Sequence, residues 1–116
     1  MRRLIAAFGH SLDGLRDIWR GEEAFRIEAI CLAASLPVAA WLGETPFHAA
    51  TLIGSVLLIM IVEVLNSAIE STVDRIGPER HDLSRRAKDL GSLSVLLAVL
   101  LALLLWLAAL VGHVTA

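Results

Sequence analysis

The segment from Leu90 to Gly112 carries no charged side chain and is long enough to cross a lipid bilayer as a helix. A transmembrane helix takes ~20 predominantly apolar residues, so a run of this length argues against a soluble fold. The whole chain of 116 residues is 57% hydrophobic, which is high for a soluble domain. We therefore expect a single integral membrane domain over residues 1–116.

Two further segments are apolar enough to cross a bilayer. The first is the weaker, because Arg26 and Glu28 lie at its inner edge and Pro37 is able to kink it. The second begins at Phe47 but is too short unless its helix continues past Val62 into a polar stretch. The predicted membrane helices are residues 24–42, 47–73 and 90–112.

The first 21 residues have a different pattern. Apolar residues from Leu4 to Trp19 recur at helical spacing, and arginine and aspartate residues occupy the positions between them. A segment this charged is typical of a helix that lies on a membrane surface. The predicted fold class is thus an all-α polytopic membrane protein, with three transmembrane helices and an N-terminal amphipathic surface helix.

The basic residues predict the orientation. All ten Lys and Arg residues lie before the first span or at its inner edge, or between the second span and the third, and the segments 43–46 and 113–116 contain none. The positive-inside rule then places the N-terminus and the second loop in the cytoplasm, and the first loop and the C-terminus outside. Trp41 and Trp106 fit an interfacial aromatic belt, although Trp106 fits a packed core equally well.

Four polar side chains emerge from the second span, at steps of three or four residues that keep them on one face of a helix. They are Glu63, Asn66, Glu70 and Asp74. At ~1.5 Å per residue from Phe47, a ~30 Å hydrocarbon core is crossed near Asn66. Ionisable groups at that depth normally face a bundle interior and indicate a functional site; the alternative is a helix end that runs out into water.

This arrangement suits the transfer of a polar group to a membrane-embedded acceptor. For phosphoryl transfer, Glu22, Glu70 and Asp74 are candidate Mg²⁺ ligands, and Glu63 is the candidate general base. Arg85, Arg86 and Lys88 are candidate phosphate contacts. Each of these charges, taken singly, is more often a solvated surface residue. The familiar nucleotide-binding motifs are absent, so a proton-linked transporter or a non-enzymatic assembly subunit remains open at this point.

Three helices enclose little space. A chain of this size is too small to surround a lipid headgroup and a second substrate, so we expect a homo-oligomer with a site shared between protomers. Gly54 and Ser55 allow close helix approach in such an assembly. Nothing in the sequence predicts a nucleic-acid partner.

Three segments resemble the prokaryotic diacylglycerol kinase family. They are Glu22–Glu28, Glu63–Gly77 with its Glu-x-x-Asn-Ser-Ala-Ile-Glu run, and Leu83–Ser92 with its Ala-Lys-Asp run. The resemblance implies a homotrimeric enzyme of the bacterial inner membrane that uses Mg²⁺ and ATP to phosphorylate diacylglycerol to phosphatidic acid. The first segment is more similar to the diacylglycerol branch than to the related undecaprenol kinases, which are the alternative.

The resemblance also implies roles for individual residues. Glu63 matches the general base, and Glu22 and Glu70 match the metal-binding carboxylates. The implied nucleotide-binding residues are Arg3, His10, Glu22, Asn66, Glu70, Asp74, Glu79, Arg80, His81, Lys88 and Asp89. The implied lipid-binding residues are Arg3, Ser11, Arg16, Glu28, Glu63 and Ser92. Two positions depart from better-known members: His10 replaces a tyrosine and Leu12 a tryptophan.

Overall fold

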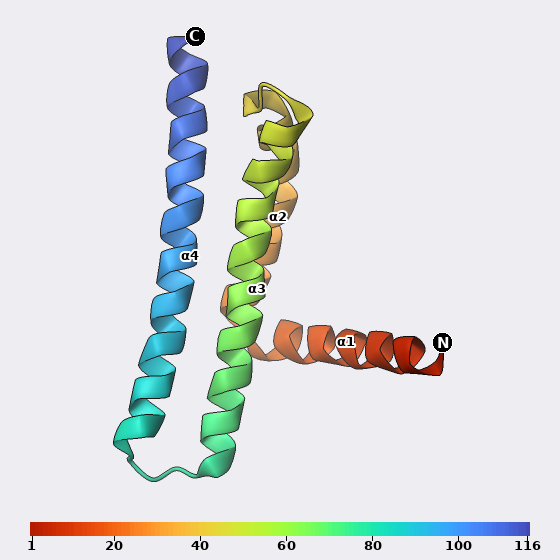
Figure 1. Cartoon of the computed structure of the whole chain (residues 1–116), viewed down its shortest axis with the longest axis vertical. Coiled ribbons are helices and arrows are strands. Elements are labelled where there is room, and N and C mark those ends of the chain that lie inside the picture. Colours follow the sequence, from red (N-terminus) through yellow and green to blue (C-terminus); the bar gives the residue numbers. More distant parts are fainter.

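The computed structural model describes residues 1–116 and contains four α-helices and no strand (Figure 1). Three of the helices are long and apolar enough to cross a membrane. This confirms the predicted all-α membrane fold with an N-terminal amphipathic helix. The helices are α1 (Arg2–Gly21), α2 (Glu23–Leu42), α3 (Pro46–Ile76) and α4 (Asp82–Thr115).

The ends of α3 are encoded by local residues. Thr45 is the N-cap, and its Oγ1 accepts a hydrogen bond of 3.0 Å from the backbone N–H of His48. Pro46 follows at the first helical turn, where a missing N–H costs nothing. At the other end, Gly77 has φ 157°, a conformation that favours glycine, and Pro78 prevents the helix from continuing. These residues define the two turns that reverse the chain.

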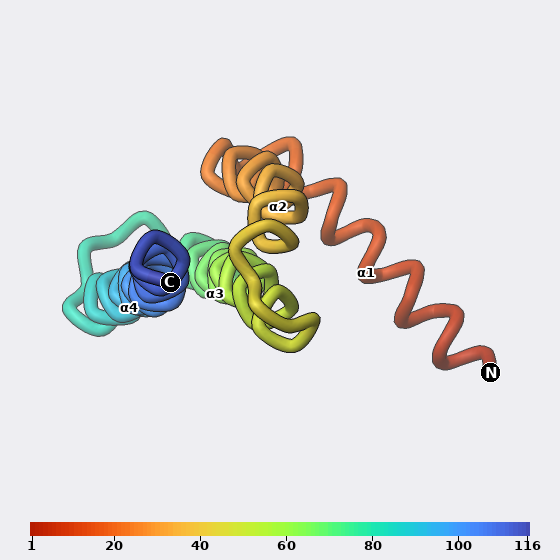
Figure 2. Tube along the Cα trace, turned by 90° about the horizontal axis from the view of Figure 1, so that it is seen from above, coloured from red at the N-terminus to blue at the C-terminus, as the bar shows by residue number.

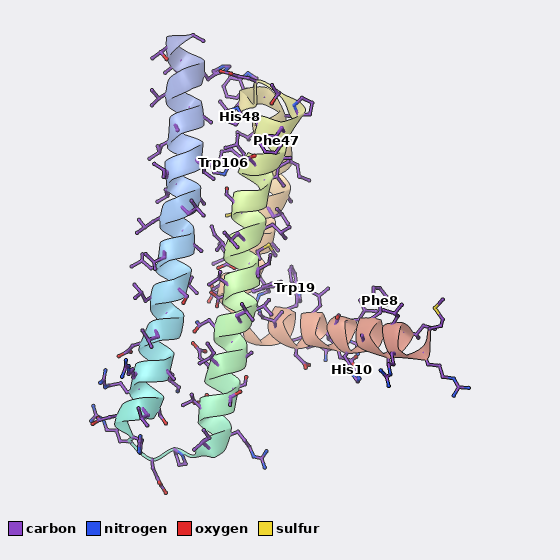
Figure 3. The ribbon with its side chains drawn as sticks, in the orientation of Figure 1. Phe8, His10, Trp19, Phe47, His48 and Trp106 are labelled. Carbon is purple, nitrogen blue, oxygen red and sulfur yellow. The ribbon has the colours of Figure 1, made fainter.

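The helix α3 lies between α2 and α4 and packs against both, whereas α1 leaves the bundle sideways (Figures 1 and 2). Arg26 of α2 stabilises this orientation of α1, because its Nη1 donates to the carbonyl oxygens of Trp19 at 2.7 Å and Arg20 at 3.4 Å in the last turn of α1. Phe8 and Trp19 project from one side of α1 and His10 from the opposite side (Figure 3). An apolar and a polar side along a projecting helix are what a membrane-surface helix requires.

The tightest packing lies near the turn between α2 and α3. We call this region the apolar end and define it by its buried residues Ala39, Leu42, Leu52 and Ala109. Trp106 of α4 lies between α4 and α3 (Figure 3), and its Nε1 donates at 3.1 Å to both the Leu52 carbonyl oxygen and Ser55 Oγ. Trp106 is therefore a half-buried residue that packs against this core and joins two helices. The indole of Trp41 instead packs against the ring of His113, with ring centroids 4.5 Å apart and the ring planes tilted by 59°.

Candidate functional site

The polar face predicted on the second span is buried in part. Glu63 and Asn66 are only 7% and 8% exposed, although both are polar and both belong to a membrane helix. One turn further along, Asn66 Nδ2 donates to Glu70 Oε1 at 3.2 Å. Asp74, a turn beyond Glu70, is exposed. The helix thus carries its polar face from the protein interior into solvent without interruption.

Carboxylates from other segments gather around Glu63. Glu22, at the junction of α1 and α2, and Glu70 are near enough to interact electrostatically with it, as is Glu28 of α2. Glu28 Oε1 is buried and has no hydrogen-bond partner. We call this cluster the polar end of the bundle and define it as Glu22, Glu28, Glu63, Asn66 and Glu70.

No basic side chain forms a salt bridge with the carboxylates of the polar end. The two salt bridges of the chain involve other residues, and Arg26 donates only to carbonyl oxygens. Clustered carboxylates without a cationic partner are hard oxygen donors of the kind that divalent cations need. The chemistry and charge of these residues suit a divalent cation, although no three such groups of one chain converge closely enough to hold a metal ion.

A charged groove of about 310 Å³ adjoins the polar end, between the last turn of α3, the loop that follows it and the first turns of α4. Lys88 Nζ pairs across it with Asp74 Oδ1 at 2.6 Å, and Arg85 Nη1 pairs with Asp89 Oδ2 at 2.9 Å. Lys88 precedes the apolar part of α4, and the hydrogen bond and charge of Asp74 raise its pKa above the ordinary value. The groove brings together six residues of the predicted nucleotide set: Asp74, Glu79, Arg80, His81, Lys88 and Asp89.

The remaining predicted residues lie outside the polar end and the charged groove as defined above. Arg3, His10 and Ser11 are exposed on α1, the helix that leaves the bundle sideways (Figure 1), and Ser11 Oγ donates to the Ala7 carbonyl oxygen of its own helix at 3.0 Å. Arg16 lines a separate and mainly apolar cavity of about 680 Å³ between α1, α2 and α3. Ser92 is exposed on α4, one turn beyond Lys88.

Two residues beside the site were not assigned a role from the sequence. Ser67 follows Asn66, and its Oγ is buried without a hydrogen-bond partner. Gly91 of α4 is buried against Asn66. Both lie inside the runs that carry the family resemblance, but neither has a side chain whose chemistry alone suggests a site.

The fold and the site define a class of protein, a three-span helical membrane protein with a partly buried carboxylate cluster that adjoins a charged groove. The family model described as prokaryotic diacylglycerol kinase matches residues 9–110. The chain belongs to this family, and it is a bacterial membrane protein.

Curated relatives match nearly the whole chain. The diacylglycerol kinase of Escherichia coli strain K12 is 49% identical over 111 residues, which cover 96% of this chain and 91% of that protein. The diacylglycerol kinase of Haemophilus influenzae is 45% identical, covering 91% of this chain and 90% of its own length. That of Pseudomonas aeruginosa is 42% identical, covering 97% and 91%.

Proposed function

We propose that this chain transfers the γ-phosphoryl group of ATP to the free hydroxyl of diacylglycerol, forming phosphatidic acid and ADP. The observation that carries the proposal is Glu63, a carboxylate only 7% exposed on a membrane helix whose polar face continues to a charged groove, in a chain of a kinase family. A lipid hydroxyl reaches this depth from the bilayer, and a nucleotide reaches the groove from water. The site therefore suits a reaction between one membrane-bound and one soluble substrate.

In this reaction Glu63 accepts the proton of the lipid hydroxyl while the oxygen attacks the γ-phosphorus. The bond from that phosphorus to the bridging oxygen of ADP breaks, and ADP leaves with the electron pair. Lys88 supplies positive charge to the phosphates from the groove, with the side chains of residues 79–81 around the nucleotide. Glu28 interacts electrostatically with Glu63 from α2 and is assigned to the glycerol headgroup of the lipid.

Glu22 and Glu70 are the residues that would hold Mg²⁺. The bound ion would offset the negative charge of the phosphates. Glu70→Gln removes one anionic ligand and keeps the acceptor of the Asn66 hydrogen bond, so the Mg²⁺ concentration for half-maximal activity should rise ~10-fold or more. An unchanged Mg²⁺ titration in both Glu70→Gln and Glu22→Gln would refute this assignment.

The functional unit in this proposal is a homotrimer in the inner membrane, with the N-terminus and residues 77–81 in the cytoplasm and the C-terminus outside. Only 15 of 116 residues are buried in one chain, and Arg3, His10 and Ser11 lie away from Glu63, so a neighbouring protomer is needed to complete the site. Native mass spectrometry should give three copies. A periplasm-active reporter fused after Ala116 should be active, and activity at Pro78 instead would overturn the orientation.

The deciding experiment measures phosphate transfer by the purified protein in lipid bilayers. ATP should be consumed only when a lipid alcohol is added, and diacylglycerol should be preferred over undecaprenol when the two are assayed side by side. Consumption without either lipid, or none with both, would contradict the proposal. A preference for undecaprenol would instead assign the protein to the related undecaprenol kinases.

A further inference from the structure

Gly91 is the place where α4 comes closest to the polar end. A Cβ built on Gly91 would collide with Asn66 Oδ1 and lie 3.2 Å from Asn66 Cγ. Gly112, in the same helix, would meet nothing within 4 Å. Position 91 therefore has no room for a side chain, whereas position 112 has.

The nature of the colliding atom separates Gly91 from a purely structural glycine. A Cβ on Gly43 would meet backbone atoms, with the Ala39 carbonyl oxygen and the Ala49 nitrogen each at 2.8 Å, so the chain itself would have to move. At Gly91 the obstacle is the end of one side chain. A methyl group there is accommodated most easily by rotation of Asn66, and the helices can keep their places.

The hydrogen-bonding groups of the Asn66 side chain are only partly satisfied. Its Nδ2 donates to Glu70 Oε1 at 3.2 Å, while its Oδ1 is buried without a partner. The side chain as a whole is 8% exposed. A buried acceptor left unpaired costs free energy, so it persists only where the surrounding packing fixes it. Gly91 is the packing neighbour of that atom.

We infer that Gly91 is a positioning residue for phosphoryl transfer. It acts indirectly, by fixing the Asn66 side chain, which in turn orients Glu70. Its missing side chain lets the Asn66 amide lie between α4 and Glu70, and the amide occupies one carboxylate oxygen of Glu70. The other oxygen is then directed away from Asn66 and is available to a cation. This inference rests on the proposed function, because it assigns Gly91 to the same reaction.

The test compares Gly91→Ala with Gly112→Ala in the full-length protein in bilayers. Gly91→Ala should lower kcat ~10-fold or more, as small displacements of catalytic groups do, and should raise the Mg²⁺ requirement while the KM for diacylglycerol stays the same. Gly112→Ala, an identical change in open space, should leave all three values unaltered. In the metal-free protein, Gly91→Ala should also shift the side-chain NH₂ resonances of Asn66 in NMR spectra, and Gly112→Ala should not.

A double variant distinguishes positioning from packing. Asn66→Ser shortens the side chain that the methyl group would strike, so adding Gly91→Ala to Asn66→Ser should cost little more activity than Asn66→Ser alone. Additive losses, or a Gly91→Ala enzyme with normal kcat and Mg²⁺ titration, would overturn the inference. If Gly91→Ala fails to fold, the double variant should fold; failure of both would make Gly91 a packing residue. Inactive wild-type protein would refute the proposed function instead.

Discussion

The two ends of the helical bundle satisfy their polar groups to different degrees. At the apolar end, the indole N–H of Trp106 has two acceptors, and Ser55 Oγ also donates to the Leu52 carbonyl oxygen at 2.6 Å. At the polar end, Glu28 Oε1 and Asn66 Oδ1 are buried without partners, as is the neighbouring Ser67 Oγ. One helix, α3, runs through both regions.

This difference indicates a division of labour along the bundle. Unpaired buried polar groups destabilise a protein, and they are more costly still where lipid excludes water. Local rules of folding are most often broken at functional sites, with the cost met elsewhere in the structure. The apolar end should therefore supply stability, and the polar end should supply chemistry. Each change below affects one of these properties and spares the other if the division is right.

The largest effect is expected for Glu63→Gln. The amide keeps the shape of the side chain but removes the proton acceptor, so turnover should fall by ~10² or more. Thermal stability should stay the same or rise, since a buried carboxylate without a cationic partner becomes neutral. Glu44→Gln, which makes the same change on an exposed residue beside the apolar end, should be silent in both assays. A fully active Glu63→Gln protein would end the catalytic assignment.

The reverse pattern is expected for Leu52→Ala. Leu52 is 0% exposed in the apolar end, and its truncation leaves a cavity between the helices. The free energy of unfolding should fall by about 2 kcal/mol, the lower part of the range for buried leucines, because lipid is as apolar as the core it replaces. Activity per folded molecule should be unchanged. Leu57→Ala is the matched control, because Leu57 lies on the same helix but is 46% exposed. An equal fall in the free energy of unfolding for Leu57→Ala would show that packing at Leu52 contributes nothing specific.

A smaller effect is expected for Lys88→Ala in the charged groove. Because Asp74 raises its pKa, Lys88 stays protonated at neutral pH and can contact phosphates. The KM for ATP should rise on the order of 5-fold, as for loss of one charge-assisted contact, and the KM for diacylglycerol should not change. Arg86→Ala removes a neighbouring cation outside the groove and should alter neither. A change confined to the lipid KM would show that Lys88 has a different role.

The sequence predicted the membrane class, the three spans and the polar face of α3, because apolar length and helical spacing are local properties. It did not predict which polar groups are buried or left unpaired, since burial of Asn66 depends on the approach of Gly91 from α4. The sequence left open whether Trp106 belongs to the membrane interface or to the core, because its acceptors lie more than 50 positions away. Contacts between distant segments depend on helix packing, which spacing within one segment does not encode.

The smallest effect on stability is expected for Trp106→Phe. This change removes a single hydrogen bond from the apolar end and is therefore the finest test of the division between the two ends. Phenylalanine keeps an aromatic ring between α3 and α4 but removes the Nε1 donor. Ser55 Oγ still donates to the Leu52 carbonyl oxygen, so both oxygens that accept from Trp106 keep one hydrogen bond. The loss should therefore be close to the ~0.6 kcal/mol average for hydrogen bonds between membrane helices, measured by reversible unfolding in detergent. kcat and both KM values should match the wild type, because Trp106 belongs to the apolar end. A fall in kcat larger than the fall in stability would show that the two ends are coupled through α3, and the division of labour would then have to be abandoned.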